Sequence, residues 1–242
     1  MYYDQSTFDI RCEWGAEGLS ALLPGSRAVV VVDVLSFSTS VDIAVGNGAI
    51  VYPYRTRDHT AADYARSYHA LLANSTREFE GGGYSLSPSS LVDIPAGTAL
   101  VLPSPNGSTL SLSTGDIPTF AGCLRNATVL ADVLQQYETG ISIIPAGERW
   151  KEQRTLRPAI EDLVGAGAII HALKGTRSPE AETAAAVFDK FKGNLASLLN
   201  ASGSGKELIG RGYEEDVRLA ASLDVSGSVP VLAGEAYRLR KS

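Results

Sequence analysis

The chain has 242 residues, of which 44% are hydrophobic and 20% are charged, and its net charge at pH 7 is -6. This size and composition predict a folded protein with one large α/β domain or two small ones, and they exclude a mainly disordered chain. The acidic balance, without any block rich in Lys and Arg, argues against a broad nucleic-acid or anionic-membrane surface. We therefore expect any bound anion to be small and to be held locally.

The N-terminal stretch and the two cysteines indicate the compartment. The first residues lack a basic region followed by an apolar core, and no run approaches the roughly 18 apolar residues of a membrane span. Cys12 and Cys123 stand far apart without a metal-ligand spacing, so we expect free thiols rather than a zinc site or a disulfide. These features predict a cytoplasmic protein.

The first predicted elements lead to a central strand. Residues 8–14 favour a strand and residues 16–23 favour a short helix. Residues 28–32 are apolar throughout, which is typical of a strand buried on both faces. Asp33 follows directly, and a carboxylate there is costly to bury unless a metal ion or a hydrogen-bond network partners it. The strand end is therefore a candidate cation site, although a short polar residue is equally common in an ordinary turn.

A helix and another strand follow. Ser38 and Thr39 precede an apolar stretch that ends near Gly46, so one hydroxyl is expected to cap a helix whose free N–H groups favour an anion. The same residues also suit an ordinary βα turn. Residues 49–54 are predicted as the next strand. They form a βαβ unit with residues 28–32, which predicts two parallel strands joined by a right-handed crossover.

The middle of the chain has another strand that ends in polar residues. Residues 58–73 predict a helix, and the glycine-rich residues 78–90 predict a loop that is either a lid or a plain connection. Residues 97–103 predict a buried strand, which runs into a polar turn at residues 104–109 before a short helix. Further predicted elements are a strand at residues 118–123 and a helix at residues 126–136.

The last part of the chain has a third predicted strand that is followed by polar or charged residues. Residues 141–145 predict a strand, and Glu148 and Arg149 follow it. Residues 158–173 predict a helix with Pro near its start. The remaining predictions are helices at residues 181–199 and 206–223, a weak strand at residues 229–232 and a polar tail at residues 237–242.

Carboxylates and an amide stand at the three strand ends, as Asp33, Asn106 and Glu148. In an open α/β sheet such loops gather at the carboxyl edge, where ligands bind. Glu161 and Asp162 lie in the first turn of a predicted helix, where the helix dipole alone also favours acids. Hard oxygen ligands of this kind suit Mg²⁺, and no Cys/His cluster competes for a softer metal.

Five motifs, in order, resemble one known family. Their order and spacing from about residue 28 to residue 232 are similar to those of the 2-phosphosulfolactate phosphatase family. The motifs are Asp33-Val34-Leu35 with Ser38-Thr39; Asn106-Gly107-Ser108; Pro145-Ala146-Gly147-Glu148-Arg149; Glu161-Asp162-Leu163 with Gly165-Ala166-Gly167; and Gly212-Tyr213-Glu214-Glu215-Asp216 before Val229-Pro230-Val231.

The resemblance implies a three-layer α/β/α fold around a mixed, largely parallel sheet, in a single α/β domain of residues 1–242 with room for two sub-lobes. It implies a Mg²⁺-dependent phosphatase that converts (R)-2-phospho-3-sulfolactate to 3-sulfolactate and phosphate in coenzyme M biosynthesis. The expected partner is a small anionic phosphorylated substrate, and neither nucleic acid nor a membrane is expected. A homodimer is one expected assembly.

The resemblance favours the acids and Asn106 as site residues without assigning their individual roles, and a leading mechanistic hypothesis supplies the expected roles. Asp33, Glu148 and Arg149 are expected to be catalytic. The attacking group is left open between water and Asp33, and water is favoured because the acids are spread over several strand ends. The expected ligands of Mg²⁺ are Asp33, Glu161 and Asp162. The expected substrate-binding residues are Ser36, Ser38, Thr39, Ser104, Asn106, Gly107 and Ser108.

The chain departs from the family pattern at two places. Ser36 follows the first motif and Thr109 follows the second, where the family usually has arginine. Arginine suits sulfonate, carboxylate or phosphate through its planar charged fork, which a hydroxyl cannot replace. Arg149, Arg154 and Arg157 are candidates to compensate. Two alternatives therefore stay open, a phosphatase of a different small phosphomonoester and a non-catalytic anion-binding relative.

Overall fold

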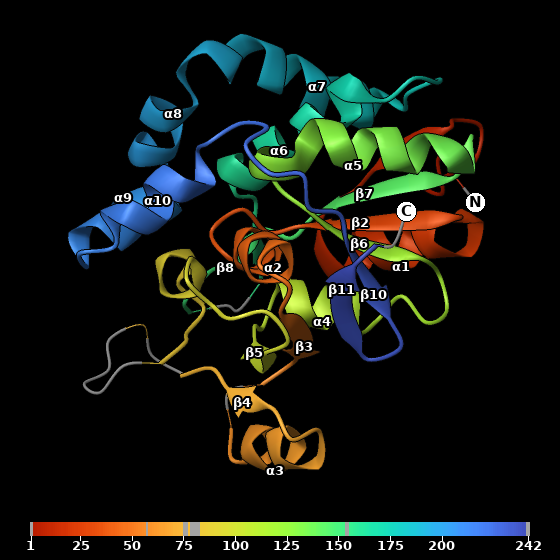
Figure 1. The fold of residues 1–242 in the computed structure, drawn as a ribbon. Coiled ribbons are helices and arrows are strands. Elements are labelled where there is room, and N and C mark those ends of the chain that lie inside the picture. Colours follow the sequence, from red (N-terminus) through yellow and green to blue (C-terminus); the bar gives the residue numbers. More distant parts are fainter. Residues whose placement is uncertain (1, 57, 75–76, 78–82, 153–154, 241–242) are drawn as a thin grey trace.

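The computed structural model describes residues 2–56, 58–74, 77, 83–152 and 155–240 (Figure 1). The strands are β1 (Ile10–Cys12), β2 (Ala28–Val32), β3 (Ile50–Tyr54), β4 (Leu71–Leu72), β5 (Ala99–Pro103), β6 (Thr119–Gly122), β7 (Ile141–Pro145), β8 (Glu148–Arg149), β9 (Leu156–Arg157), β10 (Pro230–Ala233) and β11 (Ala236–Leu239). The α-helices are α1 (Gly15–Leu22), α2 (Phe37–Gly46), α3 (Thr60–Ser67), α4 (Gly107–Ser111), α5 (Ala127–Leu134), α6 (Ile160–Ala172), α7 (Pro179–Phe191), α8 (Leu195–Ala201), α9 (Gly203–Gly210) and α10 (Glu214–Ala220). Short 3-10 helices are η1 (Leu23–Gly25), η2 (Pro88–Leu91), η3 (Leu124–Asn126), η4 (Gln135–Tyr137) and η5 (Lys192–Asn194).

Most strands belong to one mixed sheet in the order β1-β7-β2-β6-β10-β11-β3-β5-β4. The strands from β1 to β6 run parallel to one another, and so do β3, β5 and β4. The antiparallel hairpin of β10 and β11 joins these two parallel blocks. The prediction of a mixed, largely parallel sheet is confirmed. Strands β8 and β9 form a separate antiparallel pair.

Strand β2 lies inside the first block because all its residues are apolar and both faces are covered. Val29 packs in a cluster with Leu110 of α4, whereas Val30 packs in a cluster with Leu130 of α5. This alternation follows from the two-residue period of a strand. Helices α1 and α4 cover one face of the block, and α5, α6 and α7 cover the other (Figure 1). The predicted three layers are confirmed.

The prediction that β2 and β3 run parallel is wrong, because the three antiparallel pairings β6–β10, β10–β11 and β11–β3 lie between them and reverse the strand direction. Strand β2 pairs with β6 and β7, whereas β3 pairs with β5 and β11. Helix α2 therefore carries the chain from one parallel block to the other. It contacts β6 and β3, while α4 contacts β2 and β3, so both helices pack between the blocks (Figure 1). A local strand–helix–strand pattern does not show that strands from later in the chain separate its two strands.

The predicted polar tail is also wrong, because Ala236–Leu239 form β11 and Tyr237 is fully buried. The hydroxyls of Tyr237 and Ser111 share a hydrogen bond of 2.7 Å. The ring of Tyr237 lies edge-on to the ring of Phe37, with 6.1 Å between centroids. Gly234, with φ of 63°, allows the tight turn that folds this strand back onto β10.

Three predicted helices are shorter or divided. His69, with φ of 51°, lies beyond the end of α3, and the chain continues as β4 instead of as helix to residue 73. The predicted helix at residues 181–199 is α7 and α8 with η5 between them. Gly212, with φ of 83°, separates α9 from α10. Within the described part of the chain, no helix combines the length and the apolar character that crossing a membrane requires.

Candidate functional site

A cavity of about 1050 Å³ opens where β2, β5 and β7 end. Its wall includes Asp33 after β2, Asn106 after β5 and Glu148 after β7. The structure thus brings together the three strand ends that the sequence places at one edge. Because β2 and β5 belong to different parallel blocks, the cavity lies where the two blocks meet. Of the other predicted residues, Ser36, Ser104 and Arg149 also line it.

Asp33 is buried between the starts of two helices. Its Oδ1 accepts the N–H of Phe37 in α2 at 3.1 Å, and its Oδ2 accepts the N–H of Gly107 in α4 at 3.0 Å. Burial, together with the nearby Glu148 carboxylate, raises the pKa of Asp33 to about 7, against the opposing effect of these two N–H groups. Asp33 therefore exchanges a proton near neutral pH and is held in a fixed orientation.

Gly107 binds Asp33 rather than an open part of the cavity. A Cβ on this residue would lie 2.2 Å from Cδ1 of Phe37, so only glycine lets the two helix starts approach this closely. Its N–H is used by Asp33. Gly107 thus has a structural contact that builds the site, and its predicted substrate contact stays a prediction.

Three of the hydroxyls predicted to bind substrate are buried and hydrogen-bonded to the main chain. Ser38 donates to the carbonyl of Val31 at 2.8 Å and accepts the N–H of Asp33 at 3.0 Å. Thr39 donates to the carbonyl of Val34 at 2.8 Å, and Ser108 donates to that of Leu102 at 3.0 Å. None of the three lines the cavity. The structure therefore gives them a role in shaping the loops after β2 and β5, and their contact with substrate stays a prediction.

Two further acids lie at the start of α6. Asp162 accepts the N–H of Val34 at 2.7 Å and the N–H of Gly147 at 2.8 Å, so it ties the loops after β2 and β7 together. Burial, with the nearby carboxylates of Asp33 and Glu161, raises its pKa well above the usual range. Glu161 is also buried, and no donor in the described part of the chain reaches its Oε2. These two acids lie behind the cavity wall rather than in it.

Glu148 is the acid of the third strand end. Asn106 donates its Nδ2 to Glu148 Oε2 at 3.1 Å, which joins the loop after β5 to the loop after β7. Burial raises the pKa of Glu148, while the hydrogen bond from Asn106 and the charge of Arg157 oppose that rise. Asn106 therefore orients a carboxylate that faces the cavity.

The donor chemistry of these acids fits Mg²⁺. The described residues contain no ready cage of three or more His, Cys, Asp or Glu side chains. Mg²⁺ does not need one, because it keeps several waters and is commonly held by one or two carboxylates plus substrate phosphate. A cation would also supply a partner for the buried Oε2 of Glu161, since an unpaired buried polar oxygen costs free energy.

Positive side chains, with the acids Glu152 and Glu207, line the rest of the cavity. Arg157 lies 5.9 Å from the centroid of the Trp150 ring and donates to Ser204 Oγ at 3.0 Å, which fixes its position. Of the two other arginines predicted to compensate, Arg149 lines the cavity and Arg154 lies outside the described residues. The basic residues of the lining are Arg77, Arg149, Lys151, Arg157 and Arg211. The lining therefore offers basic groups to an anionic ligand, although it also holds acids.

Arg77 and Arg211 were not predicted for the site. Arg77 donates to Ser36 Oγ at 2.6 Å, so it reaches the loop after β2 although 41 residues separate the two in sequence. It stands near the glycine-rich segment, which has no hydrophobic period that would place it. A signal that was available is the acidic motif at 214–216, because Asp216 pairs with Arg77.

Comparisons with known proteins agree with the geometry of the site. The chain is 27% identical to a 2-phosphosulfolactate phosphatase of Methanothermobacter thermautotrophicus, over 86% of this chain and 87% of that protein. It is 29% identical to probable 2-phosphosulfolactate phosphatases of Carboxydothermus hydrogenoformans, over 84% of this chain and 85% of that protein, and of Gloeobacter violaceus, over 83% and 86%. The family model described as 2-phosphosulpholactate phosphatase matches residues 19–235. The chain therefore belongs to the 2-phosphosulpholactate phosphatase family, whose name describes phosphate monoester hydrolases.

Proposed function

We propose that the protein is a Mg²⁺-dependent phosphatase that hydrolyses (R)-2-phospho-3-sulfolactate to 3-sulfolactate and phosphate, a reaction of coenzyme M biosynthesis. The observation that carries the proposal is one cavity with buried carboxylates at the strand ends and arginines around them. The relatives' names support the same substrate. Buried free thiols at Cys12 and Cys123 support the further proposal of a cytoplasmic location.

The roles that we propose for the acids follow from their positions in the site. Asp33 in the cavity wall, with Glu161 and Asp162 behind it, would hold Mg²⁺, which would polarise a phosphoryl oxygen and lower the pKa of a bound water. Glu148 faces the cavity, and Asn106 fixes its orientation. Its raised pKa suits it to accept a proton from the attacking water.

The proposed binding of the phosphoryl group uses the basic part of the lining. Arg149 and Arg157 offer charged N–H donors to the phosphoryl oxygens, and such contacts stabilise the charge of a phosphoryl transition state. Attack by water is favoured over attack by Asp33, because both carboxylate oxygens of Asp33 already accept backbone N–H groups. An acid quench during turnover of ³²P-labelled substrate should therefore leave no label on the protein.

The test of the proposed function is phosphate release from 2-phosphosulfolactate and a panel of phosphomonoesters, with Mg²⁺ and with a chelator. We expect release that requires Mg²⁺ and that is fastest with 2-phosphosulfolactate. Mg²⁺-dependent phosphate release from a different ester would support the proposed reaction but assign it a different substrate. Absence of release from every ester would support the non-catalytic anion-binding alternative.

A further inference from the structure

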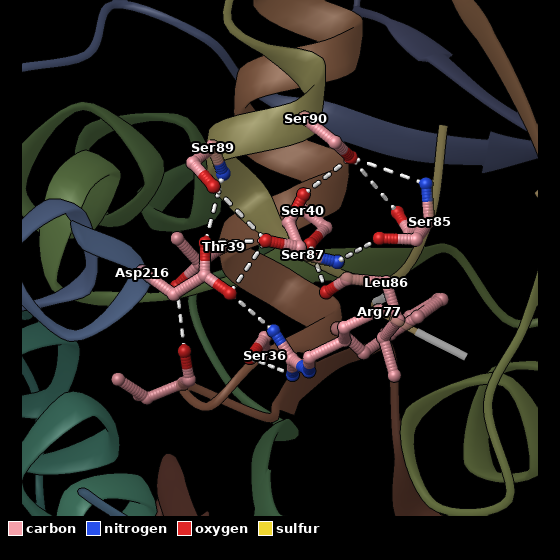
Figure 2. A network of polar contacts seen from close by, with 12 residues as sticks. Ser36, Thr39, Ser40, Arg77, Ser85, Leu86, Ser87, Ser89, Ser90 and Asp216 are labelled. Atoms are coloured by element: carbon pink, nitrogen blue, oxygen red, sulfur yellow. Dashed lines mark hydrogen bonds and ion pairs between the residues drawn. The ribbon is translucent and has the colours of Figure 1, made fainter. Parts of the chain in front are cut away.

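Arg77 lies in the cavity wall beside the loop that carries Asp33. Its Nη2 donates to Ser36 Oγ at 2.6 Å, and its Nη1 forms an ion pair with Asp216 of α10 (Figure 2). The Arg77 side chain is 12% exposed, and that of Asp216 is fully buried. The guanidinium of Arg77 is thus held at the cavity by the carboxylate of Asp216, which has no contact with solvent.

Asp216 is fixed by more than the ion pair. Ser87 Oγ donates to its carboxylate at 2.6 Å, and the N–H of Ser89 donates to Oδ1 at 3.0 Å (Figure 2). Buried polar networks whose members are satisfied hold their side chains rigidly. The carboxylate therefore sets the position of the Arg77 guanidinium.

The guanidinium of Arg211 lies near the same aromatic ring as that of Arg77. Arg77 Cζ is 5.5 Å from the centroid of the Tyr213 ring, and Arg211 Cζ is 5.6 Å from it. Arg77 and Arg211 both line the cavity. Asp216 pairs with Arg77, and Glu207, four residues before Arg211, also lines the cavity, so this wall carries both signs of charge. The carboxylates of Asp33 and Glu148 give the cavity a separate acidic part.

We propose that Arg77 binds an anionic group of the substrate that is not transferred, a sulfonate or a carboxylate, and that Asp216 is its positioning residue. The inference rests on the proposed phosphatase function and deepens it by assigning substrate selectivity. A planar guanidinium matches the oxygens of sulfonate and carboxylate, and a rigid one loses little entropy on binding. Phosphoryl transfer stays with the acidic part of the cavity and with Arg149 and Arg157.

The test compares four esters that differ only in their second anion. They are 2-phosphosulfolactate, with both anions; 2-phospholactate, with the carboxylate; the phosphate ester of 2-hydroxypropane-1-sulfonate, with the sulfonate; and isopropyl phosphate, with neither. Arg77→Ala should raise KM by about 10- to 100-fold for 2-phosphosulfolactate and for whichever single-anion ester carries the recognised group. The kcat/KM for isopropyl phosphate should not change. An equal loss on all four esters, or no loss on any, would overturn the inference.

Further variants separate recognition from folding. Arg77→Lys keeps the ion pair with Asp216 but removes the planar fork, so it should raise KM for the same esters by a smaller factor. Asp216→Asn should reproduce that selective rise with a cooperative unfolding transition retained; an unchanged KM would overturn its positioning role. Arg218→Ala is the matched control, because Arg218 lies on α10 in an exposed pair with Glu215, and it should change no ester.

Failure of the proposed function can be told apart from failure of this inference. If the wild-type protein hydrolyses none of the esters, the function fails, and calorimetric binding of 3-sulfolactate then tests Arg77 alone. Binding to wild type that Arg77→Ala weakens by about 10-fold or more would support the inference. Equal binding to both proteins, or no binding to wild type, would overturn it.

Discussion

Gly107 donates its N–H to Asp33 Oδ2 at 3.0 Å while its α-carbon packs against the ring of Phe37. Gly107→Ala should therefore destabilise the protein by about 1–3 kcal/mol, because its Cβ would lie 2.2 Å from Phe37 Cδ1. It should also lower activity by displacing Asp33. Urea unfolding and phosphate release measure the two effects. Gly193→Ala is the control, since no atom lies within 4 Å of the added Cβ; equal stability of the two variants would contradict the argument.

Without divalent cations, the free energy of unfolding should fall as the pH rises from about 4 to about 7. Burial beside Glu148 raises the pKa of Asp33 from 3.8 to about 7, so the folded protein holds this proton more tightly than the unfolded chain. That stability is present at low pH and is lost as the carboxyl ionises. The loss from Asp33 is at most about 4 kcal/mol, at 1.36 kcal/mol per pKa unit. Urea titrations at several pH values measure it.

The control for this pH dependence is Asp33→Asn, which removes the titrating group. Its free energy of unfolding should vary less with pH than that of the wild type over the same interval. Absolute stability is a poorer readout, because an Asn side chain cannot accept both N–H groups that Asp33 accepts. Identical pH slopes for the two proteins would show that Asp33 is not the group responsible.

Mg²⁺ should raise the melting temperature at neutral pH. A ligand at 100 times its Kd stabilises the folded state by about 2.7 kcal/mol. Glu161→Gln should weaken this response, because it removes the charge beside the buried and unpartnered Oε2. Glu215→Gln, in an exposed pair on α10, should respond as wild type does. A wild-type melting temperature that is insensitive to millimolar Mg²⁺ would argue against the proposed metal.

Asp33→Asn separates an enzyme from an anion-binding relative. An enzyme should lose about 10²- to 10⁴-fold in metal-dependent phosphate release. A simple anion binder should bind phosphate at least as tightly, because the change removes a repelling charge. Phosphate release and calorimetry on the same preparation distinguish the two, and turnover that survives the substitution would remove Asp33 from the proposed mechanism.

The sequence predicts the site where short local patterns determine it. Asp33 follows β2 directly, Asn106 and Glu148 come three residues after β5 and β7, and all three line one cavity. The roles of the Ser38 and Thr39 hydroxyls, in contrast, are not determined by a local sequence pattern. Their positions before a helix fit either anion binding or loop closure, and only the structure shows that backbone carbonyls take their protons.

Contacts between segments that lie far apart along the chain could not be predicted from the sequence. The guanidinium of Arg77 reaches Ser36 although 41 residues separate the two in sequence. The partner that holds Arg77 is Asp216, which is 139 residues away. Neither residue belongs to a periodic pattern that indicates the pairing. The separation of β2 from β3 has the same cause, because β10 and β11 enter between them from the end of the chain.

The place of the β10–β11 hairpin has a consequence for how the protein is made. Asp33 and Glu148 come from one parallel block and Asn106 from the other, and this hairpin is the only sheet connection between the blocks in the described part of the chain. It is also the last described element to leave the ribosome. The continuous sheet that underlies the site therefore cannot close until residues 230–239 have been synthesised, so pairing within each block can precede pairing between the blocks.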